Sequence, residues 1–106
     1  MIIRTWNGWT TAENAAAYEE LLNSTIAPNI IARNIPGLSE LTVLRRLPTE
    51  ATAHFQTLMT FDNWASVERF AGPTPAGSVV PEPARRLLAR HDEQSQHFEL
   101  LRTHRP

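Results

Sequence analysis

The residues of this chain that could do acid–base or electrostatic chemistry lie in two strand-like segments, one near each end. His97 falls in the C-terminal segment, and an imidazole there can give or take a proton near neutral pH. Arg4 and Asn7 fall in the first segment, flanked by tryptophans. They would either hold an oxygenated ligand or pair with the last strand. The alternative for His97 is structural: a half-buried imidazole bonded to Glu99 or to the backbone.

Aromatic side chains form a second group of candidates, because they are numerous for so small a chain. A flat apolar pocket for an aromatic ligand would use them, and so would a packed core, which is the favoured role for most of them. The set comprises Trp6, Trp9, Tyr18, Phe55, Phe61 and Trp64.

Several classes of chemistry have no support in the composition. The chain has no cysteine, which excludes a disulfide, a thiolate nucleophile and a cysteine-ligated metal. All ten basic residues are arginine, which excludes Schiff-base chemistry and indicates a GC-rich bacterial genome. The four histidines have no short ligand spacing, and the four glycines form no phosphate-binding loop. We therefore expect neither a metal nor an organic cofactor.

Length and charge set the broad class. A chain of 106 residues predicts one domain, residues 1–106. Its formal net charge of −1 argues against a nucleic-acid partner and an anionic membrane. No apolar run approaches a bilayer span, and the first residues are typical of a strand and not of a signal peptide. We expect a cytoplasmic protein.

The hydrophobic pattern of the first third predicts a strand followed by a helix. Residues 2–9 alternate as a strand does. The Thr-x-x-Glu pattern that begins at Thr10 predicts a helix starting after that residue. Pro28 predicts a kink or break, with a further helical turn over residues 29–33.

The middle of the chain predicts two strands and a second helix. The strands cover residues 38–47 and 51–61, with a hairpin at residues 48–50. Asp62 or Asn63 is expected to cap the helix. Trp64, Val67, Phe70 and Ala71 are expected to form its buried stripe. Gly72 is expected to end the helix.

The last third predicts an irregular loop, a short helix and a final strand. Residues 72–82 are rich in proline and glycine and are a plausible cover for a pocket. A short helix is expected from Pro83 to about Arg90, and the last strand over residues 96–102.

The resulting order, β-α-β-β-α-β, is that of a ferredoxin-like α+β sandwich with an antiparallel sheet. The strands over residues 38–47 and 51–61 carry apolar residues on both faces. Because a one-sided sheet usually alternates more cleanly, we expect helices on one face and a second subunit on the other. The pattern thus predicts a homodimer.

Short motifs occur along the chain in a characteristic order. They are the opening residues 1–8 with Arg-x-Trp-x-Gly, Ala17-Tyr18, Leu44-Arg45-Arg46, the block from Phe61 to Gly72, Val80-Pro81-Glu82 and the closing Gln96-His97-Phe98-Glu99-Leu100. In this order and spacing they resemble the antibiotic-biosynthesis-monooxygenase-like family of the dimeric α/β-barrel superfamily. The resemblance covers nearly the whole chain and is fairly specific for the fold.

The resemblance implies a dimeric α/β barrel and, as the favoured function, cofactor-independent oxygenation of an aromatic or polyketide-like small molecule by dioxygen. In that reading Arg4 stabilises the substrate anion and His97 assists proton transfer. The pocket would be shaped by Trp6, Phe61 and Trp64.

Three alternatives stay open. Members of the family also degrade haem, using an asparagine of the first strand, a tryptophan after the third strand and a late histidine. Asn7 matches the asparagine. Phe61 stands at the tryptophan position, unless the alignment to the family is shifted so that Trp64 takes that position. The late histidine has no counterpart, because no histidine lies between Gly72 and Arg90. The other two are a non-catalytic ligand-binding or stress-response module and an isomerase or cyclase on a similar substrate.

Overall fold

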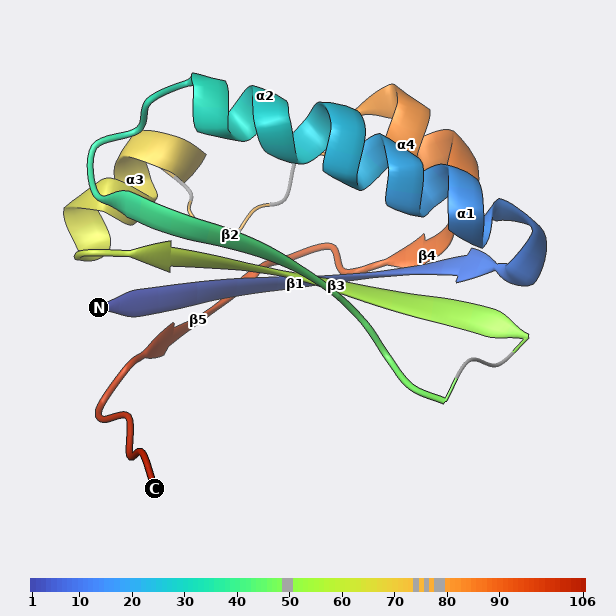
Figure 1. Cartoon of the computed structure of the whole chain (residues 1–106). Helices are drawn as coiled ribbons and strands as arrows, with labels where there is room; N and C mark the ends of the chain where they lie inside the picture. The colour runs from blue at the N-terminus through green and yellow to red at the C-terminus, as the bar shows by residue number, and fades with distance from the viewer. Residues whose placement is uncertain (49–50, 74, 76, 78–79) are drawn as a thin grey trace.

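The structure is a computed structural model that describes residues 1–48, 51–73, 75, 77 and 80–106. Five strands and a set of short helices follow one another along the chain (Figure 1). In order they are β1 (Ile2–Thr11), α1 (Ala12–Leu21), the π-helical segment η1 (Leu22–Ile26), α2 (Ala27–Ala32), β2 (Leu38–Arg45), β3 (Thr52–Phe61), α3 (Trp64–Ala71), α4 (Glu82–Leu87), β4 (Leu88–His91) and β5 (Gln96–Glu99).

The strands form one antiparallel sheet in the order β2-β3-β1-β4, with β5 also paired to β1. One edge of β1 pairs along its whole length with β3. The other edge is shared: its first half, Ile2 to Thr5, pairs with β5, and Gly8 to Thr10 pair with β4. The expected α+β sandwich with an antiparallel sheet is confirmed. The first and last strands therefore lie side by side.

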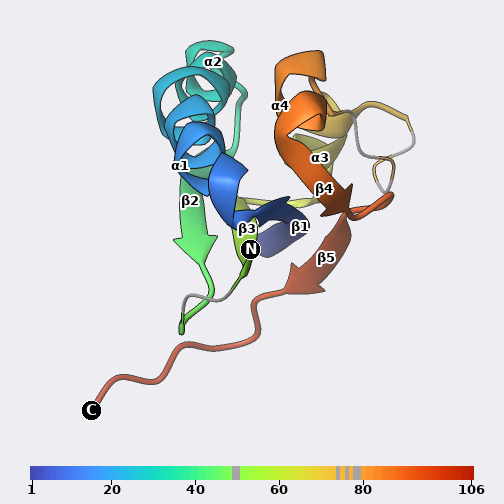
Figure 2. The ribbon, with the colours of Figure 1, turned by 90° about the vertical axis from the view of Figure 1, so that its right-hand side faces the viewer.

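The helices cover one face of this sheet in two separate groups. Turning the molecule by 90° shows α1 and α2 over β2 and β3, with α3 and α4 across from them on the other side (Figure 2). Along the sheet α3 and α4 lie near opposite ends, so they form a group only in being on the same side (Figure 1). The opposite face of the sheet carries no helix in the described part of the chain. Within the same part, no helix is long and apolar enough to cross a membrane.

The first helical segment begins one residue later than the sequence pattern predicts and does not break at Pro28. Thr11, and not Thr10, is the N-cap, and its hydroxyl accepts a bond from the Asn14 amide at 3.3 Å. Upstream of Pro28 the chain widens into the π-helical segment, where the Ala27 amide bonds to the Leu22 carbonyl. This wider turn accommodates a proline that has no amide hydrogen to donate, so the helix continues into α2.

The junction from β3 into α3 matches the sequence pattern closely. Asn63 is the N-cap, and its side-chain oxygen accepts from the amide and the hydroxyl of Ser66 at 3.0 and 3.1 Å. Gly72 ends the helix with a φ of 80°. Gly37, with a φ of 90°, crosses α3 so closely that a Cβ there would lie 1.8 Å from Ser66 Oγ. Only glycine fits that crossing without a shift of the chain.

The segment after α4 differs from its prediction. The sequence pattern predicts a helix to about Arg90, but the helix ends at Leu87 and Leu88 is extended. Residues from Leu88 to His91 instead pair with β1, because that edge of the strand offers unpaired backbone groups. The strands β2 and β5 are each shorter than predicted, and residues 49–50 of the predicted hairpin lie outside the described residues.

The core consists of two clusters on the helix-covered face of the sheet. The first joins α1 and α4 through Tyr18, Phe55 and Ala84. The second lies under α3 and consists of Met59, Phe61 and Val67. Both clusters contribute residues to a cavity that lies between the two groups of helices.

Candidate functional site

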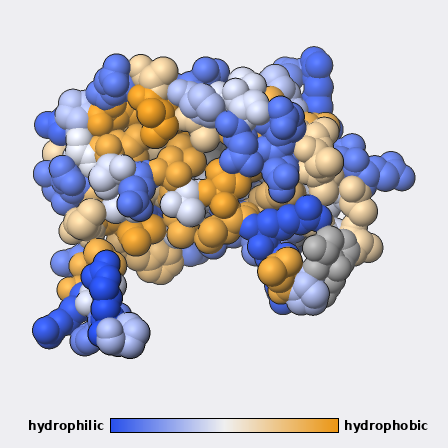
Figure 3. Space-filling model, in the orientation of Figure 1, coloured by the Kyte–Doolittle hydropathy of each residue, from blue (hydrophilic) through white to orange (hydrophobic). Residues whose placement is uncertain are grey.

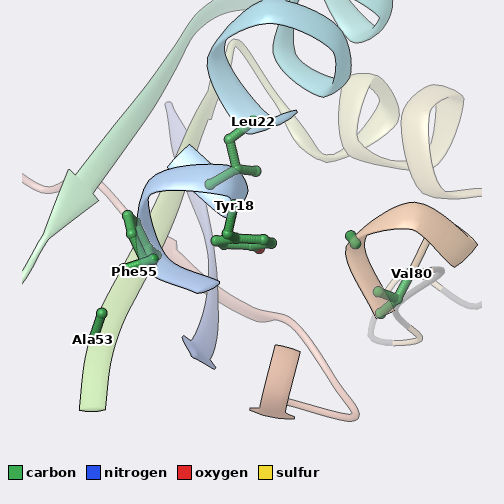
Figure 4. Close-up of a cluster of buried hydrophobic side chains, with 7 residues drawn as sticks. Tyr18, Leu22, Ala53, Phe55 and Val80 are labelled. Carbon is green, nitrogen blue, oxygen red and sulfur yellow. The ribbon is translucent and has the colours of Figure 1, made fainter. Parts of the chain in front are cut away.

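The cavity has a volume of about 120 Å³ and a mainly apolar lining. Its floor is the inner face of the sheet, and its walls are the two helix groups. In the close-up, Tyr18 extends from α1 with Val80 across from it (Figure 4). On the side towards the viewer in Figure 1, apolar surface gathers between α2 and β2 (Figure 3). Ile30 and Leu41 from those elements line the cavity and are half-buried, so the lining reaches the surface there.

Arg4 is the charged group in the cavity wall, and it is only 6% exposed. It projects from the inner face of β1, and its guanidinium donates to the carbonyl of Pro75 and, at 3.3 Å, to that of Gly77. Its Nη1 also lies 3.0 Å from His97 Nε2. The guanidinium carbon lies 5.3 Å from the centre of the Phe70 ring. Arg4 thus ties the loop after α3 to the first and last strands.

The contact between Arg4 and His97 fixes the protonation of the histidine. An arginine can only donate, so His97 Nε2 must accept and the hydrogen of the neutral ring is on Nδ1. Burial and the charge of Arg4 both lower the pKa of His97, in that order of importance. Burial also lowers the pKa of Arg4, although a guanidinium remains charged in proteins. The pair is therefore a cation beside a neutral imidazole.

Among the described residues, no carboxylate balances the charge of Arg4. In the part of the chain that the structure describes, the guanidinium has no ion pair, and its oxygen partners are backbone carbonyls. A buried cation without a counter-ion is costly unless an anion binds beside it. This arrangement suits a ligand that carries or develops negative charge.

Tyr18 supplies a second polar group to the cavity. Its ring packs edge-on against Phe55 at 5.1 Å, and burial raises the pKa of its hydroxyl to about 12. The hydroxyl therefore stays protonated, and it has no hydrogen-bond partner among the described residues. Gly8 leaves room for it, since a Cβ there would lie 3.3 Å from the hydroxyl oxygen. The phenol is free to donate to a ligand oxygen.

The remaining aromatic candidates divide between the cavity, the core and the surface. Trp6 lines the cavity, and its indole donates to the Asp92 carbonyl at 2.9 Å. Phe55 and Phe61 are packed in the core at 2% and 0% exposure. Trp64, expected on the buried stripe of α3, is 44% exposed.

His97 lies at the boundary between the cavity and the surface. Trp64 meets its ring edge-on at 5.0 Å, and the two side chains line a shallow surface cleft beside the cavity wall. Since Nε2 is directed at Arg4, the imidazole contacts the cavity through that guanidinium. The structure therefore brings His97 and Arg4 together.

Asn7 lies away from this pair, on the outer face of the sheet. Its amide nitrogen donates to Asp92 at 2.8 Å, and its oxygen lies 2.8 Å from His54 Nε2. Successive residues of a strand point to opposite faces, so Asn7 cannot share the face of Arg4. It joins a different cluster, which is described below.

Other residues that line the cavity were not among the site residues predicted from the sequence. Phe70 stacks on Arg4, and Thr57 and Met59 form part of the floor. Strand alternation could have identified Thr57 and Met59, because they fall between Phe55 and Phe61 on the same face of β3.

No group of three or more potential metal ligands occurs in the described residues. Of the loop predicted to cover a pocket, Pro81 lines the cavity, whereas residues 74, 76, 78 and 79 lie outside the described residues.

The fold is ferredoxin-like, and solved structures described as antibiotic biosynthesis monooxygenases share it. No protein-family model matches the sequence, and no curated protein sequence is significantly similar to it. Solved structures do match over nearly the whole chain. A provisionally named antibiotic biosynthesis monooxygenase from Deinococcus radiodurans has a TM-score of 0.66 at 17% identity, and the match covers 100% of this chain and 98% of that one.

Two further solved structures have different descriptions, one by its activity and one by its bound molecules. SnoaB, a cofactor-independent oxygenase from Streptomyces nogalater, has a TM-score of 0.59 at 21% identity, and the match covers 96% of this chain and 95% of SnoaB. A substituted form of MhuD with two manganese protoporphyrin IX molecules per active site has a TM-score of 0.58 at 15% identity, with coverage of 98% and 99%. The resemblance inferred from the sequence is thus confirmed at the level of the fold.

Proposed function

We propose that this protein is a cofactor-independent monooxygenase of a small acidic aromatic compound. The observation that carries the proposal is the buried Arg4 guanidinium, which faces an apolar cavity without a carboxylate partner among the described residues. A deprotonated aromatic substrate would supply the missing negative charge. The name of SnoaB, one of the structural relatives, supports the same chemistry.

The reaction needs no external reductant if the substrate carries an acidic methylene next to its aromatic system. Loss of one proton gives a resonance-stabilised anion, which transfers an electron to dioxygen and combines with it at carbon. Loss of water then leaves a carbonyl, so one methylene and one O₂ become one carbonyl and one H₂O. In this scheme Arg4 stabilises the anion, and Tyr18 donates a hydrogen bond to an oxygen attached to the aromatic ring of the substrate. The apolar walls exclude water.

The size of the cavity limits the substrate. An apolar cavity of about 150 Å³ in another protein is enough to bind benzene. The cavity here, about 120 Å³, would enclose one aromatic ring, and further rings would extend through the opening between α2 and β2. We therefore favour compounds of one or two rings over larger polyketides.

The test is oxygen uptake by the purified protein with phenols of one to three rings that carry a benzylic methylene, without added metal or cofactor. Under ¹⁸O₂ one labelled atom should enter the product, and uptake should follow product formation one to one. Compounds that bind but never consume oxygen would contradict oxygenation and favour the binding-module alternative. Product formation without oxygen uptake would favour an isomerase or cyclase.

We further propose that the protein is a homodimer that pairs through the outer face of the sheet. That face carries half-buried Ile3 and Leu58 and the more exposed Leu44 and Phe98, at 40% and 54% exposure. Burial of such side chains against a second copy would be favourable. Sedimentation at micromolar concentration should give twice the chain mass of 12.0 kDa. A single species of 12.0 kDa would contradict the prediction.

The purified protein is expected to carry no stoichiometric metal, flavin or haem. Of the three haem-branch positions, Asn7 faces away from the cavity and Phe61 is fully buried in the core. A haem would also be large for a cavity of about 120 Å³. The checks are elemental analysis and an absorption spectrum, followed by titration with haem. A Soret band that saturates at one haem per chain would overturn this prediction.

A further inference from the structure

A second cavity, of about 290 Å³, lies at the far end of the sheet, where β2, β3 and β4 approach the end of β1. It shares no lining residue with the cavity beside Arg4. A water molecule occupies about 30 Å³ in the liquid, so this space would hold a small ionic group and its hydration. The side chains that matter here are Trp9, Arg45, Arg46, His54 and Arg90.

One wall of this cavity is an ordered stack of three side chains. The Arg90 guanidinium lies 3.9 Å from the centre of the Trp9 ring, and Trp9 stacks on His54 at 4.7 Å with 16° between the planes. His54 Nε2 lies 2.8 Å from Asn7 Oδ1, and the nitrogen of the same amide donates to Asp92. Because that Asn7 oxygen can only accept, His54 Nε2 carries a hydrogen. The stack thus holds Arg90 and His54 in fixed positions.

The cavity has a strong excess of positive charge. Among the described residues, its lining has three arginines and no carboxylate, in a chain whose net charge is −1. None of the three arginines forms an ion pair with a described residue. Arginine cannot shed its charge, so the three cations repel one another unless an anion lies between them.

The lining also leaves hydrogen-bonding capacity unused. Arg45 Nε is a buried donor and has no hydrogen-bond partner among the described residues. A buried polar atom without a partner costs stability, so a ligand that bonded to it would bind favourably. Oxyanions accept several such bonds at once, and guanidinium groups bind them through paired N–H donors.

We propose that this cavity is a binding site for a small oxyanion: inorganic phosphate, or the phosphate or carboxylate group of a metabolite. Arg45, Arg46 and Arg90 supply the charge, and Trp9 and His54 form the rigid wall against which the anion lies. The site is separate from the proposed oxygenase cavity and does not depend on it. It gives the chain a second ligand, whose binding is expected to raise the stability of the fold.

The test is calorimetric titration with sodium phosphate, and separately with sodium acetate, at constant ionic strength set with sodium chloride. Wild type should bind one phosphate per chain. The double variant with Arg46→Gln and Arg90→Gln should bind it at least about tenfold more weakly, since two charge-assisted contacts are lost. Both residues are exposed, so the variant should fold. Arg102→Gln, an exposed arginine of the C-terminal tail, is the matched control and should bind phosphate normally.

The outcomes distinguish the possible sources of the anion. Stronger binding of phosphate than of acetate would favour a phosphate-bearing ligand, and the reverse order would favour a carboxylate. Equal phosphate binding by wild type and the double variant would overturn the proposal. An absence of phosphate binding by wild type would also overturn the proposal. If, in that case, the double variant were a monomer in sedimentation while wild type was a dimer, we would infer that a carboxylate of the second copy fills the cavity.

Discussion

Arg4→Met is expected to lower turnover of an oxygenase substrate by about a hundredfold or more, because the variant loses the only charge facing the cavity in the described residues. Methionine fills a similar volume, and replacement of a buried charge by an apolar side chain often costs little stability. The carbonyls of Pro75 and Gly77 lose their donor, so a modest fall in melting temperature is expected. A large loss of turnover with a small loss of stability would identify Arg4 as functional.

A direct measurement of the same effect needs no substrate. 4-Nitrophenol has one ring and a visible phenolate absorbance, so its ionisation can be followed when it is bound. A cation beside the phenolate should lower the pKa of the bound phenol by about one unit or more in wild type. The shift should be absent in Arg4→Met.

Arg33→Met is the matched control. The guanidinium of Arg33 also stacks on Phe70, at 5.0 Å, but Arg33 is exposed and lies outside the cavity lining. Turnover and the 4-nitrophenol shift should stay close to wild type in this variant. Equal losses in Arg33→Met and Arg4→Met, or no loss in Arg4→Met, would remove Arg4 from the proposed mechanism.

The meeting of Arg4 with His97 could be predicted because it depends on local rules. The ferredoxin-like order places the last strand beside the first, and the two residues are in fact directly paired across β1 and β5. Alternation along a strand then sends both side chains to the same face. By the same alternation Arg4 and Asn7, three positions apart in β1, point to opposite faces of the sheet.

The shape of the cavity could not be predicted in this way. Phe55, Met59 and Phe61 share one face of β3, yet only Met59 lines the cavity. Which of them meets a helix and which meets open space depends on where the two helix groups separate, and that is set by long-range packing. The strand β4 was not predicted, for a related reason. The sequence pattern extends the helix through Leu88, but pairing of this segment with β1 overrides that local preference.

His97→Gln is expected to keep near-normal turnover, whereas His97→Ala is expected to lose about tenfold or more. The sequence left His97 open between an acid–base role and a structural one. In the structure Nε2 accepts from Arg4 and so has no free lone pair for a substrate proton. We therefore propose that His97 positions the guanidinium. Glutamine can accept the same bond through its side-chain oxygen, and alanine cannot.

A catalytic base would behave differently in the same pair of variants. Glutamine cannot take up a proton near neutral pH, so loss of a general base would lower turnover by about a hundredfold in both variants. Equal large losses would therefore restore the acid–base role and contradict the positioning role. Unchanged turnover in both variants would leave His97 with a structural role alone.

The pH dependence of stability supplies an independent readout of the contact. The pKa of His97 is lowered in the folded state by burial and by Arg4, so the unfolded chain binds the proton more readily. The stabilisation from neutral His97 is complete above the unfolded pKa, about 6.5, and is lost as the pH falls through the lower folded value. Between pH 7.5 and pH 5, wild type should therefore lose more melting temperature than His97→Gln, which cannot titrate. Parallel losses would show that the pKa of His97 is not lowered in the folded protein, which would contradict its burial beside Arg4 and count against the positioning role.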